Sequence, residues 1–150
     1  MTSKYNKVRH LELLRRFLDS QKQGKNFHRE NRAEDSELLH YQSKLQDSIF
    51  WKSREQFALL LENFVNDLIN MEEFEIAFSR LWWENIKAHN ALKRDLKRVR
   101  NFQHNPRADG FCHFVTAVFR EFEVLEDEEC TEQEVKDYVR DTLREIQPYL

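Results

Sequence analysis

The sequence predicts an all-α protein, an antiparallel bundle of four to five amphipathic helices. The 150 residues include only 2 Gly and 2 Pro, so few positions favour a tight turn or break a helix. Apolar residues recur every three to four positions, which is the period of an α-helix. With 40% hydrophobic residues the chain can bury one core. We expect residues 1–150 to form a single helical domain, with residues 1–56 as a candidate N-terminal extension to a bundle core of residues 57–150.

The first half of the chain carries three apolar stripes. A first helix is expected over about residues 4–22, and Gly24 supplies its C-terminal stop. The polar residues 25–35 are expected to form a loop or a frayed turn. Helical periodicity then resumes and continues to Leu68, with a kink around Ser53. The inward-facing residues of these segments are Val8, Leu11, Leu14, Leu18, Leu38, Tyr41, Leu45, Ile49, Phe57, Leu60, Leu61, Phe64, Val65 and Leu68.

The longest predicted helix begins at Asn70. Asn70 and Glu73 have the spacing of a capping box, in which the N-cap residue and the third helical residue exchange hydrogen bonds, although Asn replaces the more usual Ser or Thr. We expect this helix to continue to about Val99, before a polar loop over residues 101–107. Its apolar stripe consists of Phe74, Phe78, Leu81, Trp82, Leu92, Leu96 and Val99.

Two further helices are expected after this loop. Asp109 is the predicted N-cap of the first, which carries a bulky aromatic face and ends near Phe122. Thr131 and Glu134 have capping-box spacing and predict the start of the last helix, which Pro148 ends. The inward residues are Phe111, Phe114, Val115, Val118, Phe119 and Phe122 in one helix, and Val135, Tyr138, Val139, Leu143 and Ile146 in the other.

Composition points to a soluble protein of a reducing compartment. No stretch approaches the roughly 20 apolar residues that span a bilayer, and residues 1–18 lack the features of a signal peptide. Cys112 and Cys130 match no metal spacing and do not make a disulfide scaffold. We therefore expect no membrane insertion and a cytoplasmic or other reducing soluble location, an organelle stroma included.

The sequence offers no complete catalytic or metal-binding motif. Glu37 and His40 have Glu-x-x-His spacing, but di-iron bundles need a second copy and two further inward Glu residues. Cys112 and His113 are adjacent, so on a helix they point about 100° apart and cannot pair as thiolate and base. His89 is expected to be a hydrogen-bonded, semi-buried residue. We predict a non-enzymatic protein with no catalytic residue, no metal and no cofactor.

A basic run lies on and after the longest predicted helix, with Asp95 as its only acid. It could follow a phosphate backbone, or it could be the solvated face of the helix or pair internally. The formal net charge of -3 favours the second interpretation, because nucleic-acid modules usually carry net positive charge. The run consists of Lys87, Lys93, Arg94, Lys97, Arg98, Arg100 and Arg107, of which Lys93, Arg94, Lys97, Arg98 and Arg100 form the candidate basic contact face.

An acidic segment dominates the last fifth of the chain. Residues 121–150 contain eleven acidic and three basic residues, a net charge of −8, which leaves +5 for the remainder. The six acids from Glu121 to Glu129 repel one another unless cations neutralise them. These cations could belong to the basic run, in an internal clasp, or to a partner. Trp83 is expected to be partly exposed, as interface anchors are. The candidate partner-binding residues are therefore Trp83, Glu121, Glu123, Glu126, Asp127, Glu128 and Glu129.

Residues 64–78 (FVNDLINMEEFEIAF), Phe119–Phe122 (FREF) and Thr131–Val135 (TEQEV) together resemble the colicin D immunity-like family of bacterial self-protective proteins. The resemblance covers about residues 57–150. It implies a helical bundle whose acidic surface fills the basic active site of a tRNA-cleaving toxin. The acids of the 121–129 segment are the residues to which this role carries over.

Three functions are consistent with these patterns. The first is a non-enzymatic acidic binding protein that occludes a basic protein partner, with a nuclease (tRNase) toxin as the partner implied by the resemblance. The second is a structural subunit or assembly factor of a multisubunit complex, which uses Trp83 and the basic run as contacts. The third, RNA binding through the basic face of the longest helix, is less favoured because of the net charge.

Overall fold

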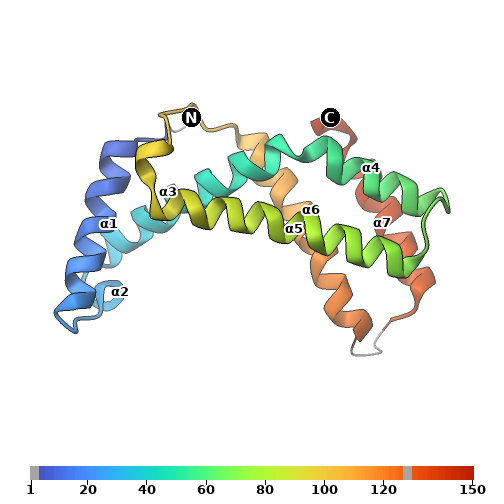
Figure 1. Cartoon of the computed structure of the whole chain (residues 1–150), viewed down its shortest axis with the longest axis horizontal. Helices are drawn as coiled ribbons and strands as arrows, with labels where there is room; N and C mark the ends of the chain where they lie inside the picture. The colour runs from blue at the N-terminus through green and yellow to red at the C-terminus, as the bar shows by residue number, and fades with distance from the viewer. Residues whose placement is uncertain (1–3, 127–129) are drawn as a thin grey trace.

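The protein is an all-α bundle, as the sequence predicts (Figure 1). The computed structural model describes residues 4–126 and 130–150, with the side chains of residues 123–126 left out. Among these residues there are seven α-helices and two short 3₁₀ helices rather than four to five helices. They are α1 (Lys7–Lys22), α2 (Phe27–Glu30), α3 (Arg32–Lys52), α4 (Arg54–Val65), α5 (Met71–Arg94), η1 (Leu96–Arg98), α6 (Pro106–Glu126), α7 (Glu132–Ile146) and η2 (Gln147–Tyr149).

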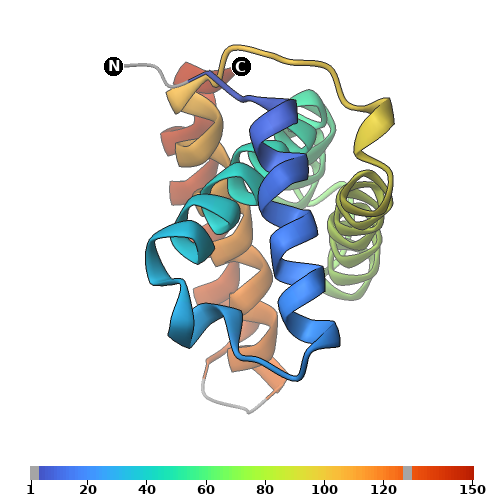
Figure 2. The same ribbon diagram turned by 90° about the vertical axis from the view of Figure 1, so that its left-hand side faces the viewer.

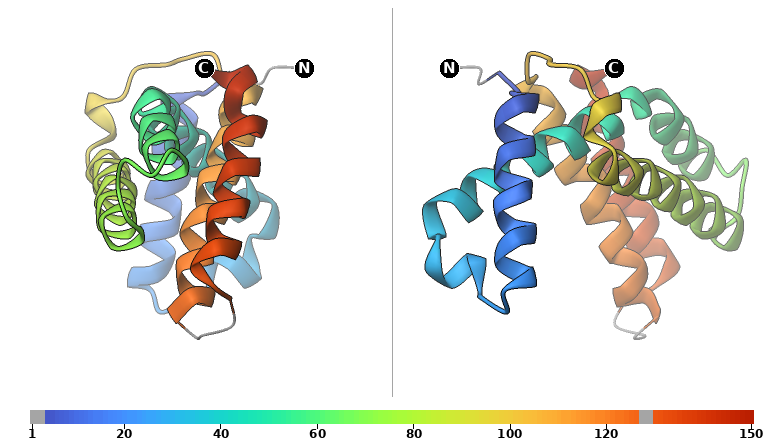
Figure 3. Two further views of the ribbon diagram at one scale, coloured as in Figure 1. Left: turned by 90° about the vertical axis from the view of Figure 1, so that its right-hand side faces the viewer. Right: turned by 60° about the vertical axis from the view of Figure 1, so that its left-hand side comes forward.

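The helices form an elongated molecule with α5 along its length (Figure 1). α3 and α4 follow one another behind α5, and α1 and α2 pack at one end against α3. α6 and α7 lie side by side and cross α3 and α4, respectively (Figure 3). No helix of the described residues is long and apolar enough to cross a membrane.

Local capping explains why the first helices begin and end where they do. Asn6 accepts a hydrogen bond from the backbone N–H of Arg9 at the start of α1, and Gly24 follows its end with φ 69°. The expected loop over residues 25–35 is partly wrong, because Asn26 caps the short helix α2 and α3 already begins at Arg32. The predicted kink at Ser53 is confirmed as the break between α3 and α4.

The start of α5 is confirmed and its predicted end is wrong. The Asn70 side chain accepts from the backbone N–H of Glu73, and the Glu73 carboxylate accepts from the backbone N–H of Asn70. The helix ends at Arg94 rather than near Val99, because Asp95 leaves the helical conformation. The next residues form η1 and bury Leu96 and Val99 elsewhere in the molecule.

α6 begins earlier and ends later than predicted. Pro106 is its first residue, where a missing N–H costs little, and the Asn105 side chain accepts from the backbone N–H of Arg107. Asp109 therefore lies in the first turn and is not the cap. The helix continues past Phe122 to Glu126. At the start of α7, the Thr131 hydroxyl accepts from the N–H of Glu134 as predicted.

The structure contains two clusters of buried apolar side chains. The larger one joins α3 through α7 and is rich in phenylalanine, with Phe64 stacked on Phe74 at 4.3 Å between ring centroids. The smaller cluster consists of Tyr5, Leu45, Leu96 and Val99. α3 contributes to both, so it connects the two ends of the molecule.

Three residues predicted to face inward are exposed. Val8 is 74% and Leu18 43% exposed, because α1 packs mainly against α3 and α2 and so buries a narrower stripe than predicted. Leu68 is 71% exposed, because it lies in the turn after α4 has ended. The division into an extension of residues 1–56 and a core of residues 57–150 stays a prediction.

Candidate functional site

Charge is separated along the long axis of the molecule. Residues 1–53 and 87–120 carry nineteen basic and nine acidic residues, a net charge of +10. Residues 54–86 and 121–150 carry five basic and eighteen acidic residues, a net charge of −13. The first group forms α1 to α3, the last third of α5 and most of α6. The second forms α4, the first two thirds of α5, the end of α6 and α7 (Figure 1). We call these two regions the basic end and the acidic end.

The structure describes only part of the predicted acidic binding segment. Glu121 is half-buried on α6. The side chains of Glu123 and Glu126 lie outside the described residues, as do Asp127, Glu128 and Glu129 altogether. The final helix adds further exposed acids, and two of these pair with neighbouring cations, Asp137 with Arg140 at 3.0 Å and Asp141 with Arg144 at 3.8 Å. Its exposed acids are Glu132, Glu134, Asp137, Asp141 and Glu145.

The backbone of Glu126 lies far from the cations that lead into α6. α6 begins beside those residues at Pro106 and ends at Glu126, after 21 residues. At about 1.5 Å per residue, the two ends of this helix are roughly 30 Å apart. The internal clasp with the basic run stays a prediction, because the side chains that would form it lie outside the described residues.

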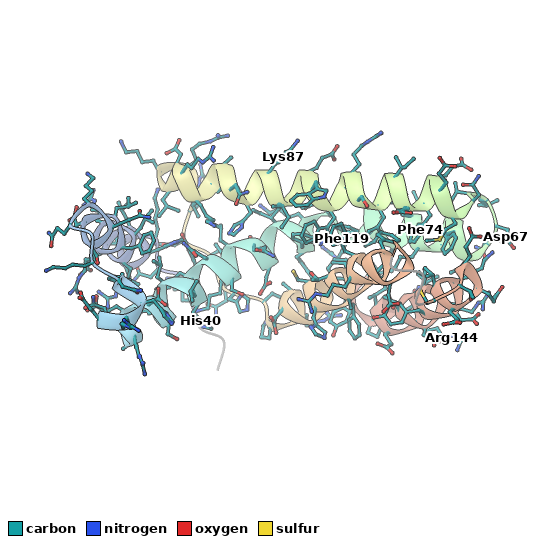
Figure 4. The ribbon with its side chains drawn as sticks, turned by 90° about the horizontal axis from the view of Figure 1, so that it is seen from below. His40, Asp67, Phe74, Lys87, Phe119 and Arg144 are labelled. Carbon is teal, nitrogen blue, oxygen red and sulfur yellow. The ribbon has the colours of Figure 1, made fainter. Side chains whose placement is uncertain are left out.

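Trp83 is exposed, as predicted, and it lies against α6. Its side chain is 50% exposed, and its ring centroid is 6.1 Å from that of Phe119. Trp82 stacks on the same Phe119 at 4.2 Å, so the two helices are joined here by aromatic contacts. Figure 4 shows Phe119 between α6 and α5. The structure thus brings Trp83 to the helix turn that carries Glu121.

The predicted basic contact face does not lie on one helix. Lys93 and Arg94 are in the last turn of α5, whereas Lys97 and Arg98 are in η1 and Arg100 follows it. The sequence prediction placed Lys93, Arg94, Lys97 and Arg98 on one helix, with Arg100 just after it, because it extended α5 through residues 96–99. Lys87 lies on the outer side of α5, away from the other helices (Figure 4).

Residues 95–105, which we call the strap, cross from α5 to α6 at the basic end (Figure 2). Hydrogen bonds to the start of the chain hold the strap in place. The backbone N–H of Tyr5 donates to the carbonyl of Phe102 at 3.0 Å, and the N–H of Lys7 donates to the Asn101 side chain at 2.8 Å. The Lys7 ammonium donates to the carbonyl of Lys97 at 2.8 Å. Leu96 and Val99 anchor the strap because their side chains are buried in the smaller cluster.

A cleft of about 530 Å³ lies between the strap, α3 and the beginning of α6. Its lining carries three cations and no carboxylate. Sequence analysis missed this cleft, because its two walls are distant in the chain: Trp51 and Lys52 lie in one segment, and Arg98, Arg100 and Phe102 lie in another. The residues that line it are Leu45, Ser48, Ile49, Trp51, Lys52, Leu92, Arg98, Val99, Arg100, Asn101, Phe102, Gln103, His104, Asn105 and Ala108.

The histidine and cysteine candidates lie in structural positions. Burial raises the pKa of Cys112 to about 12, which disfavours the thiolate that nucleophilic chemistry requires. Burial and nearby Lys93 lower the pKa of His89 to about 4, so this imidazole is neutral at pH 7. Glu37 forms a two-pronged ion pair with Arg9 at 2.8 and 2.9 Å rather than facing a metal with His40. No group of three or more His, Cys, Asp or Glu able to hold a metal occurs in the described part of the chain.

Comparison with known proteins gives no match: no family model, no curated protein and no solved structure matches the chain. The resemblance to the colicin D immunity-like family therefore stays a prediction from the sequence.

Proposed function

We propose that this chain is a non-enzymatic acidic binding protein whose acidic end engages and occludes a basic protein partner. The observation that carries the proposal is that two acidic stretches, residues 54–86 and 121–150, have a net charge of −13 by sequence and that their described residues lie at one end of the molecule. Such a field attracts a cationic surface and speeds its encounter. A net negative charge of this size also costs stability in the free protein, because the acids repel one another, and this favours binding of a cationic partner.

Trp83 supplies the apolar anchor for this interface. Charge complementarity steers partners, but affinity usually depends on a few buried aromatic side chains at the centre of the contact. Trp83 is half exposed beside Phe119, and Glu121 follows Phe119 by two residues. We propose that the partner covers Trp83 and that the surrounding carboxylates meet its cations.

A nuclease toxin is the partner that fits this proposal best. An enzyme site that holds RNA is lined with cations, and a carboxylate surface can take the place of the phosphates. This finer assignment rests on the resemblance described above. The alternative, a structural subunit or assembly factor, would use Trp83 and the basic run as contacts, and the exposed Leu59, Leu68 and Ile76 would add apolar surface for a permanent interface.

The test is capture of partners on the immobilised protein from gentle lysates of its source cells. We expect the wild-type chain to retain a basic protein, and the variant E126Q/D127N/E128Q/E129Q and the variant Trp83→Ala each to lose it at least tenfold. The matched control, E12Q/D19N/E30Q/D95N, removes four exposed acids from the basic end and should bind as the wild type does. Equal retention by the acidic-end variant would refute the proposal.

A second measurement separates inhibition from assembly. The captured partner is assayed for cleavage of tRNA with and without a molar excess of the wild-type chain. Inhibition that the acidic-end variant fails to give supports the toxin-inhibitor role. A stable complex with no nuclease activity to inhibit would instead favour the assembly role.

A further inference from the structure

The cleft under the strap has the composition of an anion site. Three cations, Lys52, Arg98 and Arg100, reach it from two separate segments, and none of its fifteen lining residues is Asp or Glu. The side chains of these cations form no ion pair or hydrogen bond with the rest of the described chain. Two other cations of the basic end are paired with carboxylates, Arg9 with Glu37 and Arg16 with Glu34, each at 2.8 Å. The charge in the cleft is therefore left for a ligand.

The cleft also offers an aromatic wall. Phe102 lines it and is held by face-to-face stacking on Tyr5, with ring centroids 4.7 Å apart and an interplanar angle of 11°. Because Tyr5 is fully buried, this pair gives a fixed, flat surface at the side of the cavity. A flat aromatic ring beside cations is the arrangement that binds a nucleobase and its phosphate together.

The site is formed before any ligand arrives. The strap is tied to residues 5–7 by backbone and side-chain hydrogen bonds, and Leu96 and Val99 are buried beneath it. A volume of about 530 Å³ lies within the range of small-molecule sites. A preformed cavity requires little ordering of the protein on binding, so a few contacts give measurable affinity.

We propose that this cleft binds a nucleoside phosphate unit, with the phosphate between Arg98, Arg100 and Lys52 and the base against Phe102. The unit is either a free nucleotide or one nucleotide of single-stranded RNA. The negative net charge of the whole chain does not oppose this, because the +10 charge of the basic end is separated from the −13 charge of the acidic end. The site is independent of the protein partner proposed for the acidic end.

The experiment measures binding of three probes to the full chain at low salt. They are a fluorescein-labelled eight-nucleotide single-stranded RNA, ATP, and inorganic tripolyphosphate as a probe of charge without a base. We expect saturable binding of RNA or ATP and at least tenfold weaker binding of tripolyphosphate. RNA binding with no ATP binding identifies a strand as the ligand, whereas equal binding of ATP identifies the free nucleotide. Two to three phosphate contacts would give a salt slope of roughly −1.4 to −2.1 for the strand.

A charge-matched pair of variants localises the site. R98Q/R100Q removes two cations of the cleft, and K87Q/R94Q removes two exposed cations that do not line it. We expect the first to weaken binding at least tenfold and the second to change it less than threefold. Phe102→Leu should weaken RNA or ATP binding and leave tripolyphosphate binding unchanged, with thermal unfolding used to confirm that each variant is folded.

Three results would overturn the proposal. The first is no saturable binding of RNA or ATP at concentrations up to 1 mM. The second is an equal loss in R98Q/R100Q and K87Q/R94Q, which would mean that surface charge alone attracts the probe. The third is tripolyphosphate binding as tight as that of ATP, which would mean that the base contributes nothing to the affinity.

Discussion

Asp47 is a carboxylic acid enclosed between α3 and α6. It is 5% exposed, and burial, with nearby Asp109 as a second cause, raises its pKa to about 6 from 3.8. Its neighbour Cys112 is a buried thiol that stays protonated at neutral pH. At pH 7 the fold therefore holds a charge that water would solvate better, which lowers stability rather than adding to it.

Asp47→Asn should therefore stabilise the protein at neutral pH. The unfolded pKa of 3.8 lies below the folded value of about 6, so the cost is fully present above pH 6 and disappears below pH 4. We expect the variant to raise the free energy of unfolding by about 1–2 kcal/mol at pH 7.5. Urea unfolding at pH 7.5 and at pH 4 measures it. A gain that persists unchanged at pH 4 would contradict this electrostatic account.

His10 and His89 give the opposite dependence on pH. The pKa of each imidazole is lowered from 6.5 to about 4, mainly by burial and secondly by the nearby Lys93 ammonium. Between pH 6.5 and pH 4 these histidines bind protons in the unfolded chain but not in the folded chain. The free energy of unfolding therefore decreases as pH falls from 6.5 towards 4. The Nε2 atom of each ring is buried with no partner among the described residues.

Substitution of His89 by Leu should remove part of this acid sensitivity. We expect the free energy of unfolding to change by less than about 1 kcal/mol at pH 7, because the loss of the hydrogen bond between His89 and the Gln42 backbone is offset by the replacement of the unpaired Nε2 with an apolar group. Between pH 6.5 and pH 4.5 the variant should lose about 1–2 kcal/mol less stability than the wild type. Urea unfolding at four pH values tests this, with His113→Leu, at an exposed position, as the control. Parallel pH curves for wild type and His89→Leu would show that His89 is not the sensor.

At the scale of the element, caps decide where the helices begin. The paired hydrogen bonds of Asn70 and Glu73 satisfy two backbone N–H groups at the start of α5, the helix that runs the length of the molecule. Asn70→Ala should cost about 1 kcal/mol of stability. Asn90→Ala, an exposed change inside the same helix, should leave stability equal or slightly higher. Thermal or urea unfolding of both variants compares them, and equal stability of the two would argue against the cap.

The same local character explains which elements the sequence predicts. Asn70 with Glu73, Gly24 and the break at Ser53 were recognisable because a cap or a turn depends on residues within one helical turn. The end of α5 was not, since Leu96 and Val99 continue the helical spacing and are drawn instead into a cluster with Tyr5 and Leu45. α2 was missed because one turn carries too little periodicity to be recognised.

The candidate sites divide in the same way. Trp83 and the acidic residues were visible in the sequence as exposed aromatic and charge signals. The cleft was not, because the contacts that create it are long-range: the Tyr5 N–H with the Phe102 carbonyl, and the Lys7 side chain with the Lys97 carbonyl. No local sequence pattern shows that residues 51–52 and 98–102 line the same cleft.

At the scale of the whole molecule, the arrangement of α6 determines how charge is distributed. The helix carries the chain from the strap, in the basic end, to Glu126 in the acidic end. The cations of the strap and the backbone of Glu126 are thereby held roughly 30 Å apart, beyond the Debye length of about 8 Å at physiological salt. Each end is left to act on partners of opposite sign.

This separation predicts the effect of removing acids on the stability of the free protein. Neutralising residues 126–129 should raise the free energy of unfolding by about 0.5–1 kcal/mol at low salt, because it relieves repulsion within the acidic end. The gain should shrink as salt is added. The control E12Q/D19N/E30Q/D95N should instead be neutral or destabilising, since its acids lie among an excess of cations, and Glu12 pairs with Arg9 at 3.1 Å. Thermal unfolding at 20 and 300 mM salt compares the two. Destabilisation by the 126–129 substitutions would mean that cations of this chain already answer those acids, and the acidic end would then have no unbalanced charge to offer a partner.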